Sequence, residues 1–170
     1  MLTIFVIVFI NLVGFGIIIP LLPFYGEHYG ASPEKVTALM ATYSLFQFLF
    51  APIWGYISDR VGRKPILIIS LLGTIIAYLL LAMAPNLIWL FVARAIAGIM
   101  AGSISAAFAF MADITTREDR TKGMGIIGSA FGLGFIAGPA IGGFLAGGDI
   151  NNTNFQVPAY YAAGFAGLAS

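Results

Sequence analysis

The sequence predicts an all-α protein that spans a membrane, and three observations support this fold class. First, 60% of its 170 residues are hydrophobic and only 9% are charged, whereas a soluble domain carries about a quarter charged residues. Second, several apolar stretches reach the roughly 20 residues that a helix needs to cross a bilayer. Third, short polar breaks separate these stretches, and lysine and arginine gather in alternate breaks.

The same composition excludes several classes of function. The chain has no cysteine and a single histidine, His28, which leaves no disulfide framework, no thiol chemistry and no cysteine- or histidine-rich metal site. The net charge is +1 and no basic stretch is long, so nothing indicates a nucleic-acid partner. The sequence offers no carboxylate pair, no serine–histidine–acid set and no phosphate-binding loop. We therefore expect no enzyme activity, no cofactor and no metal.

Six spans are predicted in chain order. The first is a retained span rather than a signal peptide, because it exceeds the roughly 7–15 apolar residues of such a peptide and lacks a basic start. The predicted spans are Leu2–Tyr25, Val36–Ile57, Pro65–Ala84, Leu87–Ala112, Gly123–Ala146 and 155–170. The last is short for a crossing and ends without a polar cap, so we expect one membrane domain, 1–170, truncated in its sixth helix.

Positive charge sets the predicted orientation. Two breaks carry most of it: Arg60, Arg63 and Lys64 after the second span, and Arg117, Arg120 and Lys122 after the fourth. The positive-inside rule places both breaks in the cytoplasm, and Met1 with them. We expect a multi-pass protein of a bacterial inner membrane, with the lipid bilayer as a partner.

Three of the polar side chains inside the first two spans are candidate cavity residues. Asn11 and Gln47 fall near the predicted midplane, and Tyr43 lies one turn from Gln47 on the same helix face. An amide without a partner in hydrocarbon is costly. Asn11 and Gln47 therefore either bridge helices or line a hydrated substrate cavity, in which Tyr43 is an aromatic wall or plain packing.

A charged loop joins the second and third spans. It concentrates glycine and charge in a few residues: Gly55, Asp59, Arg60, Gly62, Arg63, Lys64 and Pro65. Asp59 can accept hydrogen bonds from a helix N-terminus, and Arg63 can fork onto a carboxylate such as Asp113, at the end of the fourth span. The loop can therefore latch helices together, although simple anchoring by positive charge is an alternative.

The fourth and fifth spans carry the other candidate residues. Arg94 lies inside the fourth span, where a charge is expensive, so it faces either a cavity, a partner or the interface to which it snorkels. Gly98 and Gly102 follow it at helical spacing. The fifth span repeats small residues: Gly134, Gly138, Pro139, Gly142 and Gly143. This repeat predicts a tight helix contact, with a bend near Gly138 that serves gating or is static.

These motifs resemble the major facilitator superfamily over essentially the whole chain. The loop from Gly55 to Pro65 matches the signature Gly-x-x-x-Asp-Arg-x-Gly-Arg-Lys/Arg at each specified position. Arg94 with its two glycines is similar to the family's fourth-helix arginine motif, and the fifth-span glycines to its antiporter motif. Segments 14–23, 47–52 and 112–115 are most similar to the tetracycline/proton antiporter branch.

The resemblance implies twelve helices in two halves that rock about a central site, of which this chain is the six-helix N-terminal bundle. It implies a cytoplasmic gating latch made by Asp59, Arg63 and Asp113, and a proton-coupling role for Arg94. Gln47 would face a small-molecule substrate, protons would be the coupling ion, and the missing C-terminal half would be a partner.

Two positions depart from the tetracycline-exporter pattern, because Asn11 and Ala77 stand where those exporters carry aspartate. Neither can titrate, which argues against tetracycline itself as the substrate. We expect proton-coupled efflux of small amphiphilic or drug-like molecules. The alternatives are a metabolite importer or uniporter of the same fold, a six-helix protein that works as a dimer, and a non-transporting assembly factor or receptor.

Overall fold

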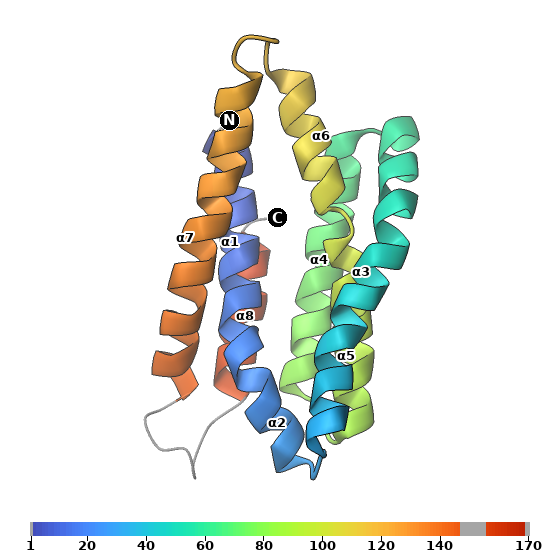
Figure 1. Cartoon of the computed structure of the whole chain (residues 1–170), viewed down its shortest axis with the longest axis vertical. Helices are drawn as coiled ribbons and strands as arrows, with labels where there is room; N and C mark the ends of the chain where they lie inside the picture. Colours follow the sequence, from blue (N-terminus) through green and yellow to red (C-terminus); the bar gives the residue numbers. More distant parts are fainter. Residues whose placement is uncertain (1, 147–155, 169–170) are drawn as a thin grey trace.

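The protein is a bundle of long helices in the computed structural model, which describes residues 2–146 and 156–168 (Figure 1). In chain order the elements are α1 (Leu2–Ile18), η1 (Ile19–Leu21), α2 (Leu22–His28), α3 (Pro33–Val61), α4 (Arg63–Ala82), α5 (Leu87–Ala101), α6 (Ile104–Ile114), α7 (Arg120–Ala146) and α8 (Gln156–Leu168). The predicted all-α architecture is confirmed. Residue 155 and the last two residues of the predicted sixth span lie outside the described residues.

Five stretches of the described residues are long and apolar enough to cross a membrane by length and composition: Phe5–His28, Pro33–Val61, Arg63–Ala82, Leu87–Ile114 and Arg120–Ala146. The second begins earlier and ends later than the predicted Val36–Ile57. It begins after Ser32, which is extended with Pro33 at the first helical position, where the missing N–H of proline costs nothing.

Two predicted spans are not single helices. The first is interrupted by the 3-10 turn η1, with Pro20 and Pro23 at the starts of η1 and α2, because proline cannot donate to the preceding turn. The fourth, predicted as continuous from Leu87 to Ala112, divides into α5 and α6 at Gly102 and Ser103.

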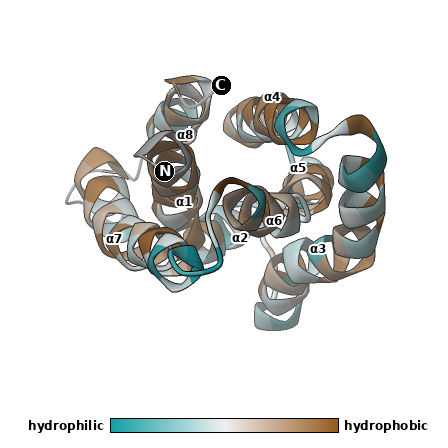
Figure 2. Ribbon diagram, turned by 90° about the horizontal axis from the view of Figure 1, so that it is seen from above, coloured by the Kyte–Doolittle hydropathy of each residue, from teal (hydrophilic) through white to brown (hydrophobic). Residues whose placement is uncertain are grey.

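The helices form two groups when the bundle is viewed from one end. Figure 2 shows α1, α7 and α8 on one side and α3, α4 and α5 on the other. One buried cluster joins α1, α4, α5 and α8 and includes Ile17, Leu81 and Leu90, and a second joins α1, α4, α6 and α7 and includes Met111 and Ile127. Both clusters therefore tie the two groups together.

The two basic connections lie at the same end of the bundle, α3–α4 beside α6–α7 (Figure 1). Many large apolar side chains face outward between the ends, including Phe48, Ile136 and Phe144, which are 77%, 73% and 88% exposed. An apolar exterior between polar ends suits a bundle surrounded by hydrocarbon.

Candidate functional site

The charged connection between α3 and α4 turns at Gly62. This residue ends α3 and precedes α4 with φ of +102°, a backbone conformation that a residue with a Cβ rarely adopts. The turn places Asp59 and Arg63 one helical turn apart, where they form an ion pair. Gly62 is thus required by the backbone conformation of the loop.

Arg63 holds three polar groups together at this end. Besides Asp59, its Nε lies 3.2 Å from Oδ2 of Asp113 on α6, and its Nη1 donates to Oγ of Ser58 at 2.7 Å. Ser58 is buried and donates in turn to the carbonyl of Gly55. The arginine therefore links α3, α4 and α6, although both carboxylates are mostly exposed.

The other residues of the loop have looser surroundings. The Arg60 guanidinium lies 4.3 Å from the ring centroid of Tyr56, Lys64 is exposed, and a Cβ added to Gly55 would meet no atom within 4 Å. A pocket of about 420 Å³ opens beside the loop, between Lys64 and Phe110. The packing of the described residues does not account for a glycine at position 55.

Arg94 is the one charged side chain that is buried among the described residues, at 3% exposure. Its guanidinium carbon lies 4.4 Å from the ring centroid of Tyr43 and 5.8 Å from that of Phe15. Its Nε has no hydrogen-bond partner among the described residues. The arginine therefore rests on two aromatic faces, which stabilise a cation by their quadrupole, and one of its donors is unsatisfied.

The helix that carries Arg94 packs directly on the backbone of α3. A Cβ on Gly98 would clash with the Tyr43 carbonyl oxygen, and one on Gly102 would lie 3.0 Å from the Ala51 nitrogen. Two glycines one turn apart thus let α5 approach α3 closely. The close approach brings the Tyr43 ring against Arg94.

The fifth-span glycines pack against α1. A Cβ on Gly138 would lie 2.6 Å from the Cα of Gly16, so backbone meets backbone at this point. Two further glycines make similar contacts, Gly134 on Leu12 and Gly142 on Ile17. These three positions recur every four residues along α7, which makes one continuous groove for α1.

The two remaining residues of that motif differ from each other. The ring of Pro139 lies beside Gly16, whereas a Cβ on Gly143 would meet no atom within 4 Å. Helix α7 continues through Pro139 to Ala146. The motif is therefore divided between a buried face against α1 and an open face.

Asn11 lies apart from the other two candidate cavity residues. It lines a cavity of about 30 Å³ with Ser70 of α4 and Ser103 of the α5–α6 break. That volume holds about one water molecule, far less than the roughly 300 Å³ of the smallest usual ligand pocket. Gln47 is half-buried on α3, one turn beyond Tyr43. A role for these residues in binding substrate stays a prediction.

Ala77 belongs to the surroundings of Arg94. It is 1% exposed and forms a small buried cluster with Tyr43 and Ala97, against which Phe15 packs. A methyl group at this position adds no charge beside Tyr43. Helix α4 thus supplies no carboxylate to Arg94 at position 77.

The profile of the Major Facilitator Superfamily matches residues 4–170 of the sequence. The chain belongs to the major facilitator superfamily. The tetracycline resistance protein, class E, of Escherichia coli is 42% identical over 170 residues, which is 96% of this chain and 40% of that protein. Multidrug resistance protein 1 of Bacillus subtilis (strain 168) is 37% identical over 168 residues, 95% of this chain and 41% of that protein.

A solved structure has the same arrangement of helices as this chain. The human organic anion transporter MFSD10 (TETRAN) superposes with a TM-score of 0.85 at 26% identity, over 99% of this chain and 44% of that one. This major facilitator chain thus spans about 40% of the length of the curated relatives it matches.

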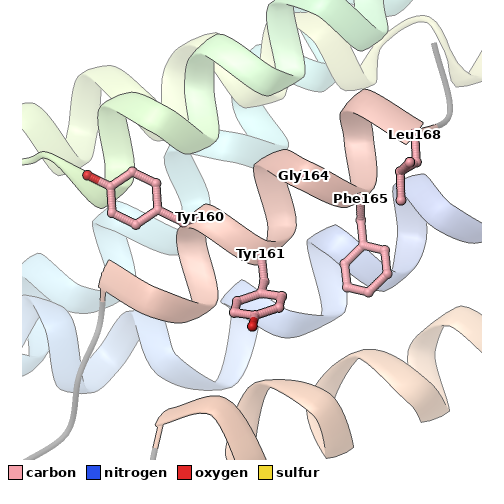
Figure 3. Close-up of a pocket in the computed structure, with 5 residues that line it drawn as sticks. All are labelled: Tyr160, Tyr161, Gly164, Phe165 and Leu168. Carbon is pink, nitrogen blue, oxygen red and sulfur yellow. The ribbon is translucent and has the colours of Figure 1, made fainter.

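An aromatic groove lies on α8 of this major facilitator bundle. It has a volume of about 540 Å³ and is lined by Tyr160, Tyr161, Gly164, Phe165 and Leu168. Figure 3 shows Tyr161 and Phe165 on one side of α8, with Tyr160 turned away from them. Its lining is almost entirely apolar, and no candidate residue from the sequence lies in it.

Sequence reasoning missed three residues that the structure places at these sites. Phe15 supports Arg94, Ser58 accepts a hydrogen bond from Arg63, and the Trp54 indole N–H donates to the Ile99 carbonyl at 2.5 Å. Ser58 directly precedes the signature Asp59, so its position was a usable signal. Phe15 and Trp54 act across helices, and their roles depend on partners distant in sequence.

Proposed function

We propose that the chain is the N-terminal half of a proton-coupled exporter of small amphiphilic or drug-like molecules that works by alternating access. Two kinds of relative support this proposal, because both are named for resistance, one to tetracycline and one to multiple drugs. We infer transport rather than catalysis, in a bacterial inner membrane with the two basic connections and the N-terminus in the cytoplasm.

The observation that carries the proposal is the buried Arg94. Even low estimates give about 2.5–3.5 kcal/mol for an arginine near the centre of a membrane helix, so such a residue is retained for function by default. A guanidinium does not release its own proton in a protein. Arg94 would therefore act on protons indirectly, by stabilising the ionised form of a carboxyl group that approaches it.

The carboxyl group would come from outside the described spans. The acidic residues of the described chain lie at helix ends or in connections, and Asn11 and Ala77 cannot titrate. We therefore assign the titrating group to the C-terminal half. Because Arg94 is 3% exposed within this half, the helices around the arginine would have to move for that group to reach it. Gln47 and Tyr43 would contribute to the substrate side of the central cavity.

The latch at the charged end would supply the gate. Arg63, Asp59 and Asp113 join three helices, and opening this end of the bundle to the cytoplasm would require those contacts to break. Because the carboxylates are exposed, the latch is weak enough to open and close repeatedly.

The test expresses the complete reading frame that contains this chain in a drug-sensitive strain and measures dye efflux with and without a protonophore. Arg94→Ala is compared with Arg117→Ala, which removes an exposed loop arginine. We expect protonophore-sensitive efflux that Arg94→Ala lowers at least about tenfold, equivalent to about 1.4 kcal/mol, at unchanged abundance, with Arg117→Ala near the parent. A dye efflux rate that is unchanged by the protonophore and by Arg94→Ala would contradict the proposal.

A further inference from the structure

The helix of the fourth span is interrupted where α5 gives way to α6, and the main-chain hydrogen bonds show how. We call this tightened turn the bend. The Ser103 N–H donates to the Met100 carbonyl at 3.1 Å, and the Ala106 N–H to the Ser103 carbonyl at 2.8 Å. Both bonds are one residue shorter than α-helical bonds. The tightened turn leaves the Ile99 and Gly102 carbonyls without their α-helical donors, Ser103 N–H and Ala106 N–H.

Side chains satisfy both of these carbonyls. The Gly102 carbonyl accepts a hydrogen bond from the Ser105 hydroxyl at 3.0 Å, which is a local contact. The Ile99 carbonyl accepts from the Trp54 indole N–H at 2.5 Å, across from α3, and from the Gly102 N–H at 3.3 Å. Carbonyls inside a helix are almost always paired, and the Trp54 indole supplies the shorter of the two hydrogen bonds that the Ile99 carbonyl accepts.

The indole of Trp54 packs so closely against Gly102 that a side chain at position 102 would clash with it. A Cβ on Gly102 would lie 2.9 Å from Cδ1 of Trp54. On another side of the bend, Ser103 lines the 30 Å³ cavity that it shares with Asn11 and Ser70. A side chain that enters the hydrogen-bond ladder of a helix is an established cause of a kink.

We propose that Trp54 is a positioning residue that holds the bend of the fourth span and, through it, the place of Arg94 against Tyr43. Helix α3 supplies both Tyr43, which faces Arg94, and Trp54, which donates to the carbonyl of Ile99. Ile99 lies five residues after Arg94 on α5. The bend and the arginine are therefore fixed relative to one partner helix. The consequence for transport rests on the proposed function, whereas the structural role of Trp54 does not.

The structural role is tested by the distance across the bend. The chain has no cysteine, so spin labels at Ile88→Cys and Ile114→Cys, which are exposed positions, report the span from α5 to α6. Labelling uses the complete reading frame with any other cysteine replaced. Trp54→Phe keeps an aromatic ring but removes the donor, and we expect the Ile99 carbonyl to regain the Ser103 N–H and the distance distribution to lengthen.

Two further variants make the distance measurement specific. Gly102→Ala should displace the indole and lengthen the distance in the same way. Trp89→Phe, which changes an indole at the far end of α5, and Gly128→Ala, where an added Cβ meets nothing within 4 Å, should leave the distance as in the parent. An unchanged distribution in Trp54→Phe would overturn the proposal.

The transport role is tested by comparing two activities of the same variants. Energised efflux needs proton coupling, whereas exchange of labelled for unlabelled substrate across de-energised vesicles does not. We expect Trp54→Phe and Gly102→Ala to lower efflux several-fold while exchange stays near the parent level. A purely structural residue would lower both activities in proportion to abundance, and that result would overturn the positioning role.

The two proposals fail in different ways. A parent protein without protonophore-sensitive efflux would refute the proposed function, and the label distances would still decide whether Trp54 holds the bend. A parent with such efflux and a Trp54→Phe variant with an unchanged bend would refute the role of Trp54 alone.

Discussion

The α1–α7 and α3–α5 crossings both depend on glycine, but different forces hold them. At the first, Gly138 meets Gly16 backbone to backbone, and neighbouring glycines contact apolar groups and main chain. At the second, Gly98 and Gly102 allow equally close packing, and polar groups then join the helices: Arg94 on Tyr43, and Trp54 on the Ile99 carbonyl. The first crossing depends on shape alone, whereas the second also has fixed polar contacts.

This difference assigns separate tasks to the two crossings. Packing of small residues in a membrane depends on van der Waals contact, which has no preferred bond angle. A hydrogen bond to a main-chain carbonyl also weakens when the donor moves away from its preferred distance and angle. We infer that the α3–α5 crossing keeps its register during transport and that movement within this half is easier along α1–α7.

The largest effect on stability is expected at the shape-dependent crossing. Gly138→Ala places a Cβ against the Gly16 backbone, which cannot move aside, and we expect a loss of about 1–3 kcal/mol in unfolding free energy. Gly143→Ala on the same helix is the matched control and should change it by less than about 0.5 kcal/mol. Detergent-denaturation titrations measure both, and equal stability of the two variants would contradict this packing.

Gly98→Ala should have the next largest effect, in comparison with Gly73→Ala. A Cβ on Gly98 clashes with the Tyr43 carbonyl, whereas one on Gly73 meets the flexible end of Met100. We expect Gly98→Ala to cost about 1–2 kcal/mol and Gly73→Ala clearly less, because methionine can change rotamer. The same detergent-denaturation titrations measure both variants. A greater loss of unfolding free energy in Gly73→Ala than in Gly98→Ala would refute the close approach of α3 and α5.

Tyr43→Leu is expected to have a smaller effect on stability, because it keeps an apolar side chain at this position and removes the aromatic face beneath Arg94. The loss of the cation–π contact should cost about 0.5–2 kcal/mol, and Tyr43→Phe should retain most of it. If the leucine and phenylalanine variants unfold alike, the ring is not what stabilises the arginine.

The smallest effect is expected at the exposed latch. Asp113→Asn removes one carboxylate from Arg63, and exposed ion pairs contribute about 0–1 kcal/mol. The difference from the parent should shrink further as salt is added, because salt screens exposed charges. A loss above about 2 kcal/mol, or one that salt does not reduce, would show that this latch is a larger part of the stability than its exposure indicates.

The sequence allowed prediction of those features that depend on the residues of one helix alone. Hydropathy and length predicted the helices, and the glycine repeat indicated a close contact in the fifth span. The four-residue spacing of Gly134, Gly138 and Gly142 already separates them from Gly143, but the identity of α1 as their partner is not visible in the spacing. The depth of Asn11 in the membrane could likewise be predicted from its position in the first span. The sequence did not show that Ser70 and Ser103 line the same cavity.

The bend in the fourth span could not be predicted from its own residues. The apolar pattern continues through Gly102 and Ser103, and neither residue breaks a helix as proline does. The shorter hydrogen bond to the Ile99 carbonyl at this bend comes from Trp54, 45 positions earlier in the chain than Ile99. The interruption of the first span differs, because Pro20 and Pro23 were visible in the sequence.

The most direct test of the account is whether substrate moves protons through Arg94. In inverted vesicles from cells that express the complete reading frame, a pH-sensitive dye reports the pH gradient while a substrate identified by the efflux assay is added. We predict that substrate dissipates the gradient with the parent and with Gly143→Ala but not with Arg94→Ala. Substrate-induced proton movement that persists in Arg94→Ala would contradict the central claim.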